Sequence, residues 1–157
     1  MYRKILVGFD GSPGSVEALK AAARLARFAG GSVTALWIHA PLPRLAGGAG
    51  EVKAEREAAE AFFKKLQQRV RRLEQEHDLP IALEQQGGNP SQALVSSAKR
   101  GKFDLIVMGH SGHSRLWGHL LGHNTDRVSE TAHCDVLIVR RPAAAKAAPA
   151  ATDGEVP

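Results

Sequence analysis

The stretch KILVGFDGSPGS, residues 4–15, leads from a short apolar run into a turn and the start of a helix. The run is apolar without alternation, which predicts a strand that is buried on both faces. In the turn, Ser12 is placed to cap a helix and Pro13 to occupy its first position. The helix should continue to about residue 29, because two glycines at 30–31 end it.

The same alternation of strand and helix repeats along the chain. Further strands are predicted at 32–40, 81–86, 103–109 and 134–140, and further helices at 51–77, 89–100 and about 117–131. Five strands that alternate with helices predict an α/β fold in which a five-stranded parallel sheet carries helices on both faces. The third strand is the most polar, which indicates a sheet edge. We therefore predict a single domain over residues 1–141 and a disordered Ala/Pro-rich tail over residues 142–157.

The bulk composition argues against several classes of protein. Apolar residues make up 43% of the chain and charged residues 24%, as in an ordinary globular protein. No apolar run approaches the roughly 20 residues that cross a bilayer, and the N-terminus lacks the pattern of a signal peptide, so we expect a cytoplasmic protein without a membrane partner. The net charge is +5, but no basic stripe with interleaved aromatics predicts a dedicated nucleic-acid partner. The densest charges, seven basic and seven acidic residues at 51–78, predict a solvated helix face.

A glycine-rich stretch, MGHSGHSRLWGHLLGHNTDRV at residues 108–128, follows the fourth predicted strand. Gly109 and Gly112 bracket a turn, and Gly122 follows ten positions later. Glycine lets the backbone approach a ligand closely, and consecutive main-chain N–H groups form a hollow that binds anions. No acidic residue occurs in the stretch before position 126. It therefore predicts a phosphate cradle, with a mere tight turn as the alternative, although it is neither a P-loop nor a dinucleotide GxGxxG motif.

Both turns follow the carboxyl ends of predicted strands. If the strand order is 3-2-1-4-5, strands one and four are neighbours, and the order reverses between them. Ligands of open α/β sheets bind at such a switch point. The order is an inference, and it places the Asp10 turn and the glycine-rich turn at one site.

Three motifs together resemble the universal stress protein family. They are ILVGFDGS (5–12), GHSGHSRLWGHLLG (109–122) and AHCDVLIVR (132–140), and the likeness extends from about residue 2 to residue 140. The resemblance implies a Rossmann-like sheet, similar to that of the adenine nucleotide alpha hydrolases, and a homodimer that pairs through its last strand. In one branch of the family it also implies a bound ATP and a regulatory role in the stress response.

The resemblance implies a nucleotide site for ATP, with Mg²⁺, built from particular residues. Asp10, with Ser12 in the same turn, would hold the base or ribose side of the nucleotide, and Ile38 would meet adenine through its main chain. The three glycines of the glycine-rich stretch, Gly109, Gly112 and Gly122, would surround the ribose and phosphates.

One position departs from the ATP-binding branch of the family. That branch has Ser or Thr directly after the third glycine, whereas this chain has His123. An imidazole is bulkier than a hydroxyl and mostly neutral at pH 7. Asn124 and Thr125 could replace the lost hydrogen bond. Two hypotheses follow: a nucleotide-binding regulator, or a dimeric interaction protein whose pocket no longer takes nucleotide.

Other chemistry is less well supported by the residues. Four histidines, at 110, 113, 119 and 123, could hold a metal, but no acidic residue is near in sequence to orient them, so we expect no metal-only site. The serines at 111 and 114 do not form a GxSxG nucleophile elbow. Slow ATP hydrolysis through Asp10 and Mg²⁺ stays open as an alternative. Asp104 is interpreted as a strand-entry residue, and Cys134, the single cysteine, as a small buried hydrophobe.

The last predicted strand, CDVLIVR at 134–140, is terminal by chain order. An exposed edge strand invites pairing with another chain. We therefore expect Val136 and Ile138 to face a second copy across a two-fold axis, while cover by the tail or by the protein's own helices is the alternative. The client protein of such a dimer cannot be identified from the sequence.

Overall fold

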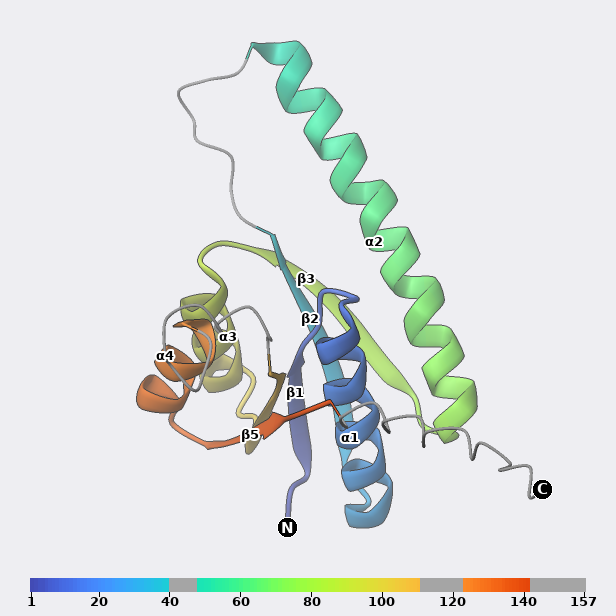
Figure 1. The fold of residues 1–157 in the computed structure, drawn as a ribbon, viewed down its shortest axis with the longest axis vertical. Helices are drawn as coiled ribbons and strands as arrows, with labels where there is room; N and C mark the ends of the chain where they lie inside the picture. The colour runs from blue at the N-terminus through green and yellow to red at the C-terminus, as the bar shows by residue number, and fades with distance from the viewer. Residues whose placement is uncertain (40–47, 111–122, 142–157) are drawn as a thin grey trace, which may run out of the picture.

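The computed structural model describes residues 1–39, 48–110 and 123–141. Its strands are β1 (Lys4–Gly8), β2 (Ser32–His39), β3 (Ile81–Gly87), β4 (Leu105–Gly109) and β5 (Asp135–Val139). Its helices are α1 (Pro13–Ala29), α2 (Ala49–His77), α3 (Pro90–Arg100) and α4 (His123–Thr131). The strands form one sheet in the order β3-β2-β1-β4-β5, and every neighbouring pair is parallel (Figure 1). The predicted sheet order is confirmed, and so is β3 as an edge strand.

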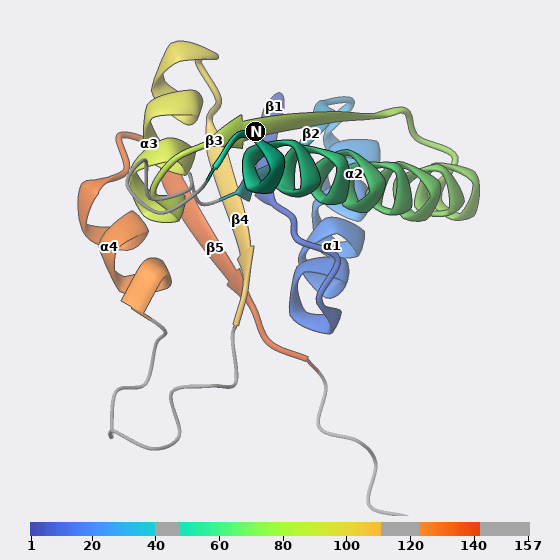
Figure 2. The same cartoon turned by 90° about the horizontal axis from the view of Figure 1, so that it is seen from above.

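Two apolar clusters pack the helices onto opposite faces of the sheet. One cluster joins α1 and α2 to the face that carries Ile5, Val7 and Val107. The other joins α3 and α4 to the face that carries Leu6 and Ile106. All five of these strand residues are at most 1% exposed. The central strands are therefore buried on both faces, as their unbroken apolar runs predicted, and Figure 2 shows the helices on the two sides.

The helices begin where the sequence places their capping residues. The Ser12 hydroxyl accepts a hydrogen bond from the Ser15 N–H, and Pro13 is the first residue of α1. Asn89 plays the same part for α3. At its other end α1 stops at Gly30, whose φ of 64° lies in the left-handed region that favours glycine. Local capping chemistry therefore sets these helix boundaries.

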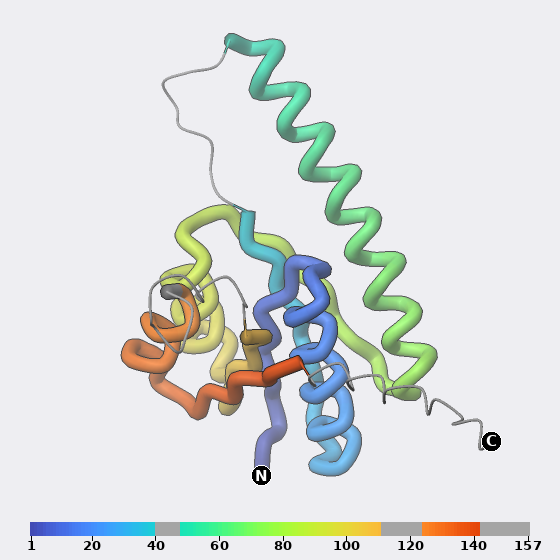
Figure 3. Tube along the Cα trace, viewed as in Figure 1, coloured from blue at the N-terminus to red at the C-terminus, as the bar shows by residue number. Residues whose placement is uncertain are grey.

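Helix α2 is long and only partly packed on the sheet. Its C-terminal half buries Leu66, Val70 and Leu73, whereas its first turns extend past the end of the sheet (Figure 3). Between these parts, Phe62 meets Trp37 of β2 with ring centroids 5.1 Å apart. The apolar side chains of α2 thus form a packing face in the second half of the helix. Most side chains at positions 49–65 are exposed.

At the amino end of the sheet, Asp104 joins the segment before β4 to the start of β1 by hydrogen bonds. Both carboxylate oxygens of Asp104 accept main-chain N–H groups at the start of β1, at 2.8 Å from Arg3 and at 3.1 and 3.2 Å from Lys4. This confirms Asp104 as a strand-entry residue. Nearby, burial raises the pKa of the Cys134 thiol, and the charges of the Asp135 and Asp104 carboxylates raise it further. Cys134 therefore stays protonated and packs as an apolar side chain.

Within the described ranges, none of the helices is both long and apolar enough to span a bilayer.

Candidate functional site

The candidate site lies at the carboxyl end of the sheet, where the strand order reverses between β1 and β4. β1 ends at Gly8 and β4 ends at Gly109, and the two strands are hydrogen-bonded neighbours. The turn that leaves β1 and the segment that leaves β4 therefore begin side by side. This is the place at which open α/β sheets bind their ligands.

The turn after β1 is held by hydrogen bonds around Asp10. The Ser12 N–H donates to Oδ1 of Asp10 at 2.9 Å, and the Asp10 N–H donates to the Ser15 hydroxyl at 3.4 Å. Partial burial opposes ionisation of Asp10, but the hydrogen bonds from Ser12 and Ser15 outweigh it and lower the pKa of this carboxyl below its usual value. Asp10 is exposed and ionised at neutral pH. It can therefore accept hydrogen bonds from ribose hydroxyls or an amino group.

Two glycines bring the turn and the end of β4 into backbone contact. A Cβ atom built on Gly109 would lie 2.3 Å from the carbonyl carbon and oxygen of Gly14, and 2.8 Å from the Ser15 nitrogen. A Cβ atom on Gly14 would in turn lie 3.3 Å from the His110 carbonyl oxygen. Gly109 is therefore required for the packing of α1 against β4. Sequence reasoning missed Gly14, although a glycine in the first turn of a helix carries a penalty in helix propensity that signals a special position.

The main-chain groups of Ile38 lie on the side of β2 that faces β1. The Phe9 N–H donates to the Leu36 carbonyl at 2.9 Å, so Leu36 directs its main-chain groups toward β1. Strand alternation gives Ile38, two residues further on, the same direction. The pairing of β1 with β2 ends at Gly8 and Leu36. The N–H and C=O of Ile38 therefore lie on the β1 side of β2, beyond the last residue that pairs with β1.

The structure places the remaining predicted site residues less completely. Asn124 is exposed in the first turn of α4, whereas Thr125 is 3% exposed and packs inside the protein. Thr125 therefore offers almost no surface to a phosphate, which leaves Asn124 as the better placed of the two. Gly112 and Gly122 lie outside the described residues, and of His123 only the backbone is described. Their roles stay predictions.

The metal hypothesis concerns the same region. Among the described residues, no group of three or more His, Cys, Asp or Glu side chains is arranged to hold a metal ion. Of the four histidines, those at 113 and 119 lie outside the described ranges. The structure places an ionised carboxylate, which accepts hydrogen bonds from hydroxyl or amino groups of a ligand, beside the start of α1 and the close contact of Gly14 with Gly109.

Residues 1–140 match the Universal stress protein family. The chain belongs to this family. Among curated relatives, Universal stress protein MJ0531 of Methanocaldococcus jannaschii is 35% identical over 147 residues, which cover 90% of this chain and 84% of the relative. The resemblance drawn from the three motifs is confirmed.

Solved structures of universal stress proteins share the fold. UspA from Lactobacillus plantarum superposes with a TM-score of 0.75 at 24% identity, over 88% of this chain and 98% of that one. A universal stress protein in complex with cAMP superposes with a TM-score of 0.68 at 27% identity, over 88% of this chain and 97% of that one. At least one neighbour of this universal stress protein thus holds an adenine nucleotide.

Proposed function

We propose that this universal stress protein binds an adenine nucleotide, ATP together with Mg²⁺, and acts as a regulator rather than as a fast enzyme. The observation that carries the proposal is the backbone contact of Gly14 with Gly109, which joins the Asp10 turn to the end of β4. It assembles an ionised carboxylate, a helix start and a strand tip at the switch point. The structural neighbour with bound cAMP supports an adenine nucleotide as the ligand.

Each described residue has a defined part in this proposal. The Asp10 carboxylate accepts hydrogen bonds from the ribose hydroxyls, with Ser12 holding the turn in place. The main-chain N–H and C=O of Ile38 meet the adenine edge. Gly109 begins the segment that would enclose the phosphates, and Gly112, Gly122, His123 and Asn124 would continue it. Mg²⁺ would neutralise phosphate charge, with phosphate oxygens and water supplying most of its ligands.

Two rival functions make different predictions. If His123 closes the pocket, the protein is a dimeric interaction protein without nucleotide. If Asp10 and Mg²⁺ promote hydrolysis, the protein is a slow ATPase that releases ADP at a steady rate. Mass spectrometry of small molecules that co-purify with the untagged protein separates the first rival from the proposal, and an ADP-release assay separates the second.

The decisive experiment is calorimetry with Mg-ATP, AMP and cAMP on a matched pair of aspartate variants. Asp10→Ala should weaken nucleotide binding about tenfold or more, because a carboxylate that bonds the ligand is lost. Asp104→Ala removes the same group from the opposite end of the sheet and should leave the affinity within about twofold. Equal affinities in the two variants, or no binding by the wild type, would reject the assignment.

His123 can be tested in the same assay. His123→Ser restores the residue type that the ATP-binding branch carries. Tighter binding by this variant would show that the imidazole obstructs the phosphates, and weaker binding would show that it donates to them.

We also propose that the protein is a homodimer that pairs through β5. This strand is hydrogen-bonded to β4 on one side and forms an edge of the sheet on the other. Val136 packs partly against its own core, Ile138 is half-buried, and Leu137 is 36% exposed. Ile138→Glu should shift the mass in light scattering toward the monomer. Phe28→Glu, at an apolar position of α1 that is 86% exposed, is the control and should not.

A further inference from the structure

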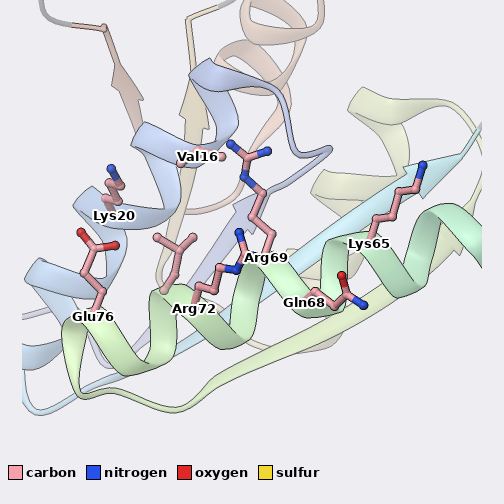
Figure 4. A pocket seen from close by; sticks show the side chains of 8 residues that line it. Val16, Lys20, Lys65, Gln68, Arg69, Arg72 and Glu76 are labelled. Carbon is pink, nitrogen blue, oxygen red and sulfur yellow. The ribbon is translucent and has the colours of Figure 1, made fainter.

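A hollow lies between α1 and α2, and its lining residues are not those proposed to bind nucleotide. It has a volume of about 420 Å³ and opens to solvent (Figure 4). Its lining includes two aliphatic side chains, Val16 of α1 and Leu73 of α2, which are 8% and 4% exposed. Its other lining residues are polar or charged and exposed or half-buried. The hollow therefore combines an apolar floor with a polar rim.

Cations dominate that rim. Lys20 comes from α1, and Lys65, Arg69 and Arg72 come from α2. On α2 they belong to a run, KKLQQRVRR at 64–72, that contains five basic residues and no acidic one. The prediction of a solvated helix face holds for this run, whose basic side chains are exposed, although the charge of the run is not balanced.

Most of these cations have no salt-bridge partner among the described residues. Over the described ranges, the ion pairs within 4.0 Å are Lys20 with Glu17 and Lys53 with Glu57. Neither pair involves Lys65, Arg69 or Arg72. Three like charges held around an apolar hollow produce a positive potential that an anionic ligand would relieve.

The three cations of α2 are spaced for an extended ligand. Positions 65, 69 and 72 lie on one helical face and span about 10 Å along the helix axis. Figure 4 shows Arg69 reaching from α2 toward α1. Guanidinium groups bind carboxylates with two parallel hydrogen bonds, and they lose less in desolvation than an ammonium group does. A ligand with several carboxylates along its length would match this row.

We propose that the α1–α2 hollow binds an acidic segment of a partner protein, in which carboxylates flank an aliphatic side chain. The carboxylates bond Arg69, Arg72 and Lys65, while the aliphatic side chain covers Val16 and Leu73. Glu76, at the end of the row, repels a uniformly charged polyanion but accepts a peptide N–H. Among the described residues, no aromatic side chain lines the hollow, and they offer no platform on which nucleobases could stack.

The test measures fluorescence anisotropy with a labelled peptide of glutamate and leucine residues, titrated with the full chain at physiological salt. The variant Arg69→Gln/Arg72→Gln should weaken binding about tenfold or more, because it removes two charge-assisted contacts. The control Lys64→Gln/Arg71→Gln removes the same charge from the same run, at exposed positions that do not line the hollow. It should change the affinity by less than about twofold.

Two competitors and a stability check complete the experiment. A single-stranded oligonucleotide and tripolyphosphate, at equal total charge, should displace the peptide poorly, and all variants should melt within about 2 °C of the wild type, because the changed residues are exposed. Equal weakening by both double variants would reduce the effect to net charge and overturn the proposal. Stronger binding of the oligonucleotide or of tripolyphosphate would also overturn it, and would identify a general polyanion surface instead.

Discussion

The two ends of the sheet each carry an aspartate, and the two aspartates do different work. At the amino end, Asp104 accepts main-chain N–H groups from the start of β1 with both of its oxygens. At the carboxyl end, Asp10 accepts the Ser12 N–H of its own turn and stays exposed. The Asp104 carboxylate therefore stabilises the fold, whereas the Asp10 carboxylate keeps an exposed surface that a ligand can contact.

The difference follows from how far the strands reach. At the amino end the start of β1 pairs with β2 and lies within hydrogen-bond distance of the residue before β4. At the carboxyl end, β1 pairs with β2 only as far as Leu36, and β2 continues to His39. The main-chain groups of Ile38 therefore lie beyond the last paired residues of β1 and β2. Because β2 continues beyond its pairing with β1, main-chain N–H and C=O groups at the end of β2 do not pair with β1 and are proposed to meet the ligand.

The largest expected effect concerns the glycine contact that defines the carboxyl end. Gly109→Ala should lower the free energy of unfolding by about 3 kcal/mol, because its Cβ would overlap the backbone of Gly14. Gly8→Ala makes the same change one strand away, where the new Cβ would lie an ordinary 3.6 Å from Leu94, and should cost less than about 1 kcal/mol. Urea denaturation measures both. Similar losses would show that the two strand ends do not differ in packing.

A second pair of glycines compares the two ends through backbone conformation. Gly11 has φ of 79° and lies where a Cβ would be 2.8 Å from Leu66, whereas Gly30 has φ of 64° and open space around it. Gly30→Ala should therefore cost about 1 kcal/mol, from the left-handed conformation alone, and Gly11→Ala about 2 kcal/mol. Thermal unfolding would rank them. Equal losses in the two variants would mean that Leu66 yields to the added methyl group.

The sequence was sufficient to predict the sheet order and most element boundaries. The buried strands are unbroken apolar runs, and the caps at Ser12, Asn89 and Gly30 are local signals that need no knowledge of distant residues. The role of Asp104 was also readable, because it directly precedes an apolar strand. The strand and cap signals depend on short segments of chain, whereas the main-chain partners of Asp104 lie at Arg3 and Lys4, on a distant segment.

Contacts between distant segments could not be read in this way. The sequence predicted that Gly109 gives a ligand access, and the structure shows that it also lets the Gly14 backbone approach, which depends on how α1 crosses β4. The burial of Thr125 depends in the same way on how α4 is rotated against the sheet. The basic run of α2 is visible in the sequence, but which of its cations line a hollow depends on how α2 packs against α1.

Alanine variants of Asp104 and Asp10 should rank in opposite order for loss of folding stability and for loss of nucleotide affinity. Asp104→Ala leaves main-chain donors of β1 without their acceptor and should cost about 1–2 kcal/mol of stability. Asp10→Ala should cost less than about 1 kcal/mol, because Asp10 is exposed. In nucleotide binding the order should reverse. If one variant were worse in both assays, the division of labour between the two ends would be wrong.

The smallest expected effect is the pH dependence that Asp10 contributes. Its pKa is lower in the folded protein than in the unfolded chain, so the ionised carboxylate stabilises the fold above the unfolded pKa of about 4. That contribution is lost as the pH falls through the folded pKa. Wild type should therefore lose up to about 1 kcal/mol more than Asp10→Asn between pH 6 and pH 3, since an exposed group is screened by solvent.

Denaturation curves for both proteins at several pH values measure this difference. Between pH 6 and pH 8 the charge of Asp10 does not change, so the stability gap between the two proteins should stay constant there. A gap that stayed constant down to pH 3 would show that the Ser12 and Ser15 hydrogen bonds do not favour the ionised form. Folding would then not favour the ionised form of Asp10, and the charge of Asp10 would not contribute to the stability of the carboxyl end of the sheet.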